Sequence, residues 1–368
     1  MPEDVSLEAA RCGVCCCSAL GRALALLFMV LLAAATLLGN ALTIAVLLGT
    51  RRYHTPHGYL KVSLAVADLA VGTLVVPLSV HAELALALGG PTPTWTSRAT
   101  GAALHPCALV GPVFAGCTLV SISTIFLLTV ERAVAVLRPL HRDAVVTRRR
   151  TGALIALSWL GSFFLAVSPL LFGRDVALEY NPCSRMCTYT PRAAASALLL
   201  FPAFDFTLLA AAVLVNLVSL GSLRRQSRRR RRLALSEHAG ARSIPSRADV
   251  RAARSIGALT LAFTASFSPV AVLVVGNARG NEWCSFSFFA FWGLAANSCW
   301  NVVIYSARER SFRQRALTLL TSAGIRRASH TIDKRPVFNA NVCGRTHLIT
   351  NALSPIADTD VQMHTQLV

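Results

Sequence analysis

The sequence predicts an all-α protein, a bundle of seven membrane-spanning helices followed by a short amphipathic eighth helix. Of the 368 residues 54% are hydrophobic and only 14% are charged, against about 25% charged residues in soluble domains. The apolar residues form long blocks, and windows of about 20 residues, enough to cross a hydrocarbon core of roughly 30 Å, identify seven spans. The predicted spans are 23–48, 59–84, 105–130, 152–172, 195–221, 253–275 and 285–306.

The segments around the spans complete the domain organisation. Residues 1–22 are expected to form an extracellular N-terminus, and 23–306 form the seven-helix bundle. In 307–321 apolar residues alternate with arginines at helical spacing, which predicts an amphipathic helix on the cytoplasmic membrane face. Residues 322–368 are polar and aperiodic, so we expect a disordered cytoplasmic tail.

The third span has the clearest boundaries. It carries no charge from Ala108 to Val130, with Cys107 at one end and the adjacent Glu131 and Arg132 at the other. A charge in the middle of a bilayer costs roughly 2.5 to 3.5 kcal/mol on insertion scales, whereas a charge at the boundary can pair or reach water. We therefore expect Glu131 and Arg132 at the water boundary.

The basic residues predict the orientation in the plasma membrane. One side carries most of them, and the other carries Arg98, Arg174, Arg185, Arg192 and Arg279. The crowded side holds Arg51, Arg52, Lys61, Arg138, Arg142, Arg148, Arg149, Arg150 and the arginines between 224 and 254. Since cytoplasmic loops carry the excess of Lys and Arg, the N-terminus is expected outside the cell. The charge of +19 is then explained by basic residues on the cytoplasmic side, where the run Arg228–Arg232 is expected to attract anionic lipid. Nucleic acid is not expected as a partner.

Four N-terminal cysteines fall on the predicted extracellular side. One interpretation is a disulfide from this group to Cys284 in the last outer loop, and the other is that the thiols stay unpaired. The group consists of Cys12, Cys15, Cys16 and Cys17.

Polar residues inside the spans are candidate functional residues, because burial of a carboxyl group in a membrane is costly. Asp68 lies in the second span, and the seventh span offers Asn297, Ser298 and Asn301 as partners. The alternative is a cluster that only holds helices together, with hydrogen bonds worth about 1 kcal/mol each. Asp205 in the fifth span has no partner identifiable in the sequence, and a protonated, hydrogen-bonded carboxyl is the simplest interpretation.

The order of landmark residues resembles the rhodopsin-like (class A) G-protein-coupled receptors over about residues 23–320, and the second span is most similar to the aminergic and adenosine branch. The landmarks are Asn40 after Gly39, Asp68 in Leu-Ala-x-Ala-Asp, Cys107, Glu131-Arg132, Trp159, Pro202, Pro269 and Asn301-x-x-x-Tyr305. Each landmark alone is weak, but one in each span in this order is specific.

The resemblance implies a disulfide from Cys107 to the second outer loop and a sodium pocket in the bundle. The bridge reaches Cys183 or Cys187: the spacing to Pro202 slightly favours Cys183, and the Cys-Thr-Tyr run favours Cys187. The implied pocket would hold an allosteric sodium ion with oxygen ligands, or water in its place. Its residues are Asp68, Ser121, Asn297, Ser298 and Asn301. No other cofactor is expected.

The resemblance also assigns a coupling site. Arg132 matches the arginine that engages a heterotrimeric G protein, with Glu131 and Tyr305 beside it, and Asp249 matches the acid that holds this arginine at rest. An arginine–carboxylate pair at a helix boundary forms a two-state latch. The alternative is that Asp249 only balances neighbouring arginines.

The implied ligand pocket is largely apolar. Phe114 stands where amine receptors carry an aspartate, and Ala295 stands where opsins carry the retinal lysine. We therefore expect a small apolar ligand, whose identity does not follow from the sequence. His81 and Glu83 are expected near the mouth of the pocket. Aromatic residues at helical spacing also serve as helix packing. The candidate lining residues are Phe114, Thr118, Phe267, Val270, Phe288, Phe291 and Trp292.

The expected function is that of a G-protein-coupled receptor, and no pattern indicates an enzyme. Ala133, Ala210, Val302 and Phe267 replace residues that the family uses in activation, which favours constitutive activity or a receptor-like protein that modulates a partner receptor without coupling itself. A transporter or channel is less favoured, because neither repeated halves nor broken helices are evident. Arrestin, receptor kinases and a receptor dimer are further expected partners.

Overall fold

The computed structural model describes residues 19–88, 106–172, 176–191, 199–234, 247–279, 281 and 283–333. The chain divides into two units, Met1–Thr321 and Ser322–Val368. All sites discussed below lie in the first unit.

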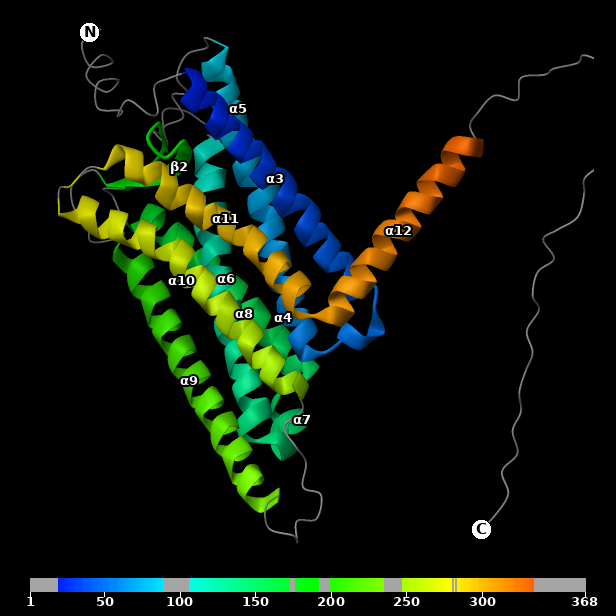
Figure 1. Ribbon diagram of the computed structural model, residues 1–368. Helices are drawn as coiled ribbons and strands as arrows, with labels where there is room; N and C mark the ends of the chain where they lie inside the picture. The colour runs from blue at the N-terminus through cyan, green and yellow to red at the C-terminus, as the bar shows by residue number, and fades with distance from the viewer. Residues whose placement is uncertain are drawn as a thin grey trace, which may run out of the picture. The chain divides into compact units, whose positions relative to one another are not determined.

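The predicted fold class is confirmed, since seven helical spans among the described residues are long and apolar enough to cross a membrane (Figure 1). One span consists of two helices, α4 and α5, which are separated by a short irregular turn. The spans are α3 (Ala19–Leu48), α4 (Pro56–Ala70) with α5 (Val76–Ala87), α6 (Pro106–Leu137), α8 (Arg148–Phe172), α9 (Leu200–Ala234), α10 (Arg247–Ala278) and α11 (Cys284–Arg308).

The second span shows how local sequence shapes a helix. Thr55 caps the start of α4, where its side-chain oxygen accepts a hydrogen bond from Gly58 N at 3.2 Å, and Pro56 occupies the first turn, which needs no N–H donor. Farther along, Pro77 has no N–H to donate, and the turn before it, Val71–Val75, is π-helical. Asp68 lies in the last turn of α4, just before this irregular turn.

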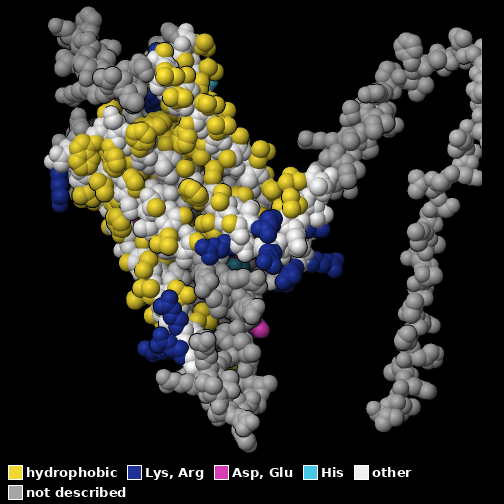
Figure 2. Space-filling view, viewed as in Figure 1, with side chains coloured by type: hydrophobic (Ala, Val, Ile, Leu, Met, Phe, Trp, Pro, Cys, Tyr) yellow, Lys and Arg dark blue, Asp and Glu magenta, His cyan; other side chains and the backbone are white. Residues whose placement is uncertain are grey.

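Helix α6 forms the centre of the bundle and packs against α4, α8 and α9, while α10 packs between α9 and α11 (Figure 1). Trp159 on α8 donates its indole N–H to Ser63 Oγ on α4 at 2.9 Å, which joins an outer helix to the centre. Large apolar side chains stay exposed on the outer helices, for example Leu157 and Leu214. Figure 2 shows hydrophobic side chains over much of the visible face, with most of the visible Lys and Arg toward one end. Such a surface fits lipid rather than water.

The shorter elements lie at the two ends of the spans. β1 (Val176–Asn181) and β2 (Met186–Pro191) pair antiparallel in a hairpin, and we call this end the hairpin end. At the other end, called the Arg132 end, are two 3₁₀ turns, Arg51–Tyr53 and Pro139–His141, and the short helix α7 (Arg142–Val145).

Two helices run farther than expected. α9 continues to Ala234, past residue 221 where the fifth span was expected to end, so the run Arg228–Arg232 is helical. α12 spans Arg310–Asp333, past residue 321 where the amphipathic helix was expected to end. Arginine dominates the extension of α9, and the extension of α12 contains two arginines and two alanines, residues that favour helix intrinsically.

Candidate functional site

Two disulfides fix the hairpin. Cys107 on α6 bonds Cys187 on β2, and Cys183 in the hairpin turn bonds Cys284 at the start of α11. Of the two possible partners of Cys107 the structure has Cys187, because pairing of the strands puts Cys187 beside α6 and leaves Cys183 in the turn. A bridge from the N-terminal cysteines to Cys284 is excluded, since Cys183 already occupies that sulfur. The N-terminal cysteines, Cys12, Cys15, Cys16 and Cys17, lie outside the described residues.

A buried ion pair anchors the hairpin turn to α5. Arg185 Nη1 lies 3.0 Å from Glu83 Oε2, and Tyr180 donates its hydroxyl to Glu83 Oε1 at 3.2 Å. Arg185 has φ 55°, a left-handed conformation that costs a non-glycine residue roughly 1–2 kcal/mol, and the ion pair offsets this cost. Burial and the neighbouring Glu83 raise the pKa of Tyr180, which keeps the phenol a donor. Glu83, expected near the pocket mouth, therefore lies beneath the hairpin, while His81 is exposed.

Two aromatic residues of α11 also hold the hairpin. Trp292 donates its indole N–H to Ser184 O at 2.9 Å, and the Arg185 guanidinium lies 5.4 Å from the centroid of the Phe288 ring. Both side chains had been expected in the ligand pocket. Neither lines the cavity described next.

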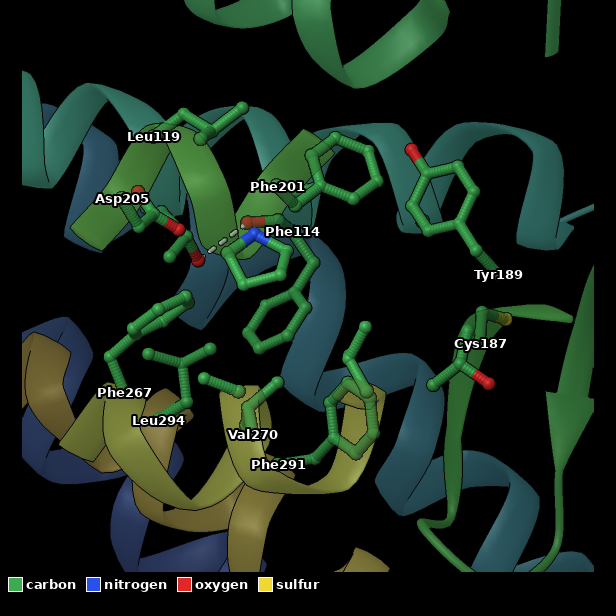
Figure 3. A pocket seen from close by; sticks show the side chains of 17 residues that line it. Phe114, Leu119, Cys187, Tyr189, Phe201, Asp205, Phe267, Val270, Phe291 and Leu294 are labelled. Atoms are coloured by element: carbon green, nitrogen blue, oxygen red, sulfur yellow. Dashed lines mark hydrogen bonds between the residues drawn. The ribbon is translucent and has the colours of Figure 1, made fainter. Parts of the chain in front are cut away.

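A cavity of about 110 Å³ lies beneath the hairpin, between α6, α9, α10 and α11 (Figure 3). The structure brings five of the seven candidate pocket residues together around it. Two aromatic residues that the sequence analysis did not single out also line it, Phe201 on α9 and Tyr189 on β2. The five are Phe114, Thr118, Phe267, Val270 and Phe291.

Asp205 is the one acid among the described residues that line the cavity. It is 1% exposed, and its Oδ1 has no hydrogen-bond partner among the described residues. Phe201 precedes it by four residues on α9, and such pairs share a helix face. That spacing is the signal in the sequence that could have placed Phe201 beside the acid.

All five predicted sodium-pocket residues meet in the middle of the bundle. Asn301 Nδ2 donates to Asp68 Oδ2 at 2.6 Å, and no ion pair to Asp68 occurs among the described residues. A second cavity, of about 10 Å³, lies beside this pair. That is close to the minimum volume that holds one water molecule. Its polar lining residues are Asp68, Ser121, Asn297 and Ser298.

At the Arg132 end, Glu131 is the centre of a charge cluster. Its carboxylate lies 3.0 Å from Arg132 Nε, 3.1 Å from His57 Nδ1 and 3.2 Å from Arg142 Nη2, and its side chain is 3% exposed. Arg132 is thus held by its own neighbour on α6. The side chain of Asp249, the expected latch partner, lies outside the described residues.

Tyr305 near the end of α11 is surrounded by groups that the sequence analysis did not connect with it. The Lys61 ammonium lies 4.5 Å from the centroid of its ring and pairs with Glu309 between α11 and α12. Phe312 on α12 packs against the same ring at 6.0 Å. In the sequence Lys61 was only one of the charges that indicate orientation, because nothing local links it to a residue 248 positions away.

Seven membrane-spanning helices, a disulfide from the start of the third span and an arginine site at its other end define a multi-pass membrane receptor. The model of the family described as "7 transmembrane receptor (rhodopsin family)" matches residues 39–305, so the chain belongs to this family. It is accordingly a G-protein-coupled receptor of the plasma membrane and not an enzyme.

Curated relatives include receptors of the two branches that the second span resembles. Adenosine receptor A2b of Bos taurus is 25% identical over 307 residues, 77% of this chain and 85% of the relative. 5-Hydroxytryptamine receptor 1B of Cavia porcellus is 32% identical over 158 residues, 43% of this chain and 38% of the relative. 5-Hydroxytryptamine receptor 1B of Homo sapiens is 30% identical over 158 residues, 43% of this chain and 37% of the relative. The match to the 5-hydroxytryptamine receptors thus covers less than half of each chain.

Proposed function

We propose that this receptor takes up a small ligand in the cavity beneath the hairpin and passes the signal to a heterotrimeric G protein at the Arg132 end. One observation carries the proposal: α6 contributes both to the cavity, through Phe114, and to the charge cluster, through Glu131 and Arg132. Eighteen residues separate Phe114 from Arg132, which corresponds to about 27 Å along a helix. A shift of this helix relative to its neighbours links the two ends.

The orientation is part of the proposal, with the hairpin outside the cell and residues 1–22 extracellular. Exposed basic residues support it, because Arg51, Arg52 and Arg148 to Arg150 all lie exposed near the Arg132 end. Cytoplasmic loops carry this excess of basic residues. The two disulfides of the hairpin also suit an oxidising compartment.

The charge cluster of Glu131 provides the resting state. Arg132, His57 and Arg142 surround one carboxylate. Arg132 therefore pairs with Glu131 on its own helix and is not available to an incoming protein. Engagement of a G protein requires that Arg132 leave Glu131. His57 and Arg142 stay beside the Glu131 carboxylate when Arg132 leaves, so the buried acid is not left without partners and the step costs less. Asp249, at the start of α10, is proposed as a second acid that holds Arg132 at rest.

We expect Arg132→Ala to reduce signalling at least tenfold. The measurement is cyclic AMP and inositol phosphate in cells that express the wild type, Arg132→Ala, Asp249→Ala and the control Arg138→Ala at matched surface levels. Arg138 is exposed at the same end and makes no side-chain contact proposed for coupling, so Arg138→Ala keeps the wild-type signal. Asp249→Ala raises the signal if it removes a latch. Equal signals above the level of empty cells in the wild type and Arg132→Ala would contradict coupling through Arg132. If no cells signal in any pathway without a ligand, the second candidate function moves ahead.

The second candidate function is modulation of a partner receptor without coupling of its own. The packing of Val302 favours it: α11 runs unbroken through this position, where the family has a proline, and a Cβ on Gly39 of α3 would lie 3.0 Å from Val302 Cγ2. A helix without proline kinks less and moves less easily. This candidate predicts no signal from the chain alone and a changed signal from a co-expressed receptor.

Further partners are proposed from the exposed surfaces of the receptor. Arrestin and receptor kinases are expected at the Arg132 end, a second receptor on the exposed apolar helix faces, and anionic lipid at Arg228–Arg232. Arg228 on α9 is exposed, and each arginine near an anionic leaflet contributes about 1 kcal/mol.

The polar cavity in the bundle fits a single small cation such as sodium. Carboxylate, hydroxyl and amide oxygens are the ligands of a hard cation, and the volume of about 10 Å³ leaves room for one ion or water. Asp68, Ser121, Asn297 and Ser298 would hold the ion, with Asn301 orienting the carboxylate. When bound, the ion neutralises the buried charge of Asp68.

We expect sodium chloride to raise the apparent melting temperature of the purified wild-type chain relative to choline chloride at equal ionic strength. At a sodium concentration ten times Kd the stabilisation is about 1.4 kcal/mol. Asp68→Asn abolishes this difference, while Asp143→Asn, an exposed acid near the Arg132 end, keeps it. An identical sodium effect in the wild type and Asp68→Asn would refute the site.

A further inference from the structure

The cavity beneath the hairpin holds an acid for which the described part of the chain supplies no partner. Asp205 projects from the second turn of α9 and is 1% exposed, and its Oδ1 makes no hydrogen bond with any described residue. Figure 3 shows its carboxyl group on the same side of the cavity as Leu119. An unpaired acid at this depth in a membrane protein is costly, so its retention calls for a partner.

The described residues of the cavity wall offer no cation to Asp205. Phe114, Leu119, Phe267 and Val270 present apolar surface, and no Lys, Arg or His is among the described residues that line the cavity. Thr118 is the polar neighbour on α6, but its hydroxyl donates to Phe114 O at 2.9 Å. Since the described residues supply no such group, we take the partner of Asp205 to be a ligand.

The volume limits the body of such a ligand. A cavity of about 110 Å³ is comparable with the engineered cavity of about 150 Å³ that binds benzene. Because the cavity is the smaller of the two, the body of the ligand is limited to about one aromatic ring, with its charged group on the Asp205 side. The surrounding phenylalanine rings favour a flat apolar body, and their faces also attract a positive charge.

We propose that the cavity binds a compact organic cation, with a protonated nitrogen paired to Asp205 and one aromatic ring among Phe114, Phe267 and Phe291. This inference rests on the proposed function, in which the same cavity takes up the ligand. It refines the expectation of an apolar ligand. On α6, Phe114 stands where amine receptors carry an aspartate, so this wall has no acid there. Asp205 supplies an acid on the α9 wall, so the charged end of the ligand faces α9.

The test uses 2-phenylethylamine and its neutral analogue 2-phenylethanol. Both probes are titrated into the purified full chain in detergent at pH 7, and the apparent Kd is obtained from the shift in melting temperature. An ion pair with hydrogen bonding favours the amine by about tenfold to hundredfold. Asp205→Asn brings the ratio of the two Kd values close to one. The control Glu179→Gln, an acid on β1 that does not line the cavity, keeps the preference for the amine.

Several outcomes would overturn the inference: an amine preference unchanged in Asp205→Asn, equal binding of amine and alcohol to the wild type, or binding of neither. Asp205→Ser serves as a second neutral replacement, so that a folding defect of one variant leaves the test intact. The readout is independent of signalling. If the wild type binds no amine but shows Arg132-dependent signalling, this inference alone is refuted. If the wild type binds the amine but gives no signal when the amine is added, the proposed coupling is refuted.

Discussion

Serine at both Cys107 and Cys187 is expected to destabilise the receptor by about 2 to 5 kcal/mol, the usual range for loss of a native disulfide. The bond closes a segment of 80 residues, and both cysteines are buried, at 0% and 5% exposure. Because the helices stay inserted in the membrane, the loss falls mainly on the hairpin. Cys187 and its neighbours Thr188 and Tyr189 line the cavity, so the cavity loses a wall.

The measurement is the apparent melting temperature of the purified double variant, with its amount on the cell surface. Cys183→Ser with Cys284→Ser is the matched comparison: it removes a bond of similar span, 101 residues, between positions that do not line the cavity. We expect it to lower the melting temperature but to preserve 2-phenylethylamine binding, which the first variant loses. Reduction of the wild type should reproduce both losses together. A Cys107→Ser, Cys187→Ser protein with unchanged melting and binding would show that the hairpin holds without its bond to α6.

The helices were predictable because membrane spans follow from length and polarity alone. From Ala108 to Val130 no charge interrupts the third span, and the structure has a helix there that continues to Leu137. In a membrane the backbone must satisfy its own hydrogen bonds, so a long apolar block has helix as its main solution. The meeting of Asp68 with Asn301 was also foreseeable, since polar groups in adjoining spans have few other partners.

The hairpin end was less predictable, since its geometry depends on strand pairing rather than on span length. Two cysteines four residues apart, Cys183 and Cys187, were both plausible partners for Cys107. Only the register of β1 and β2 decides between them. The same hairpin explains why Phe288 and Trp292 do not line the cavity. The Phe288 ring packs against the Arg185 guanidinium, and the Trp292 indole N–H donates to the Ser184 carbonyl. Their spacing in the sequence could not reveal these contacts.

Lys61 illustrates the other limit of the sequence. Its charge helped to predict orientation, but its side chain does not face the solvent. The residue is 5% exposed on α4 and pairs with Glu309 at the junction of α11 and α12. A hydrogen bond from Tyr53 OH to Ser311 Oγ, at 3.1 Å, supports the same junction. Charge pairing over such a sequence distance follows from tertiary packing, which no local pattern encodes.

Glu309→Gln is expected to lower stability by about 3 kcal/mol, because it leaves the Lys61 ammonium buried without its counter-charge. The Tyr305 ring compensates only in part through its attraction for the cation. The reverse change, Lys61→Met, should cost less, about 1 kcal/mol, because the Glu309 side chain is 24% exposed and can turn toward water. Apparent melting temperatures of the purified variants provide the measurement.

The double variant Lys61→Met with Glu309→Gln distinguishes this account from a general defect at the junction. If the cost of Glu309→Gln arises from the unpaired ammonium, removal of that ammonium restores most of the lost stability, and the double variant melts near the wild type. If the losses simply add, the two side chains act independently and the pair does not hold the junction. Since the same ammonium touches Tyr305 beside the proposed coupling site, the double variant should also free that ring. We therefore expect it to change basal signalling while melting normally, which separates an effect on switching from an effect on folding.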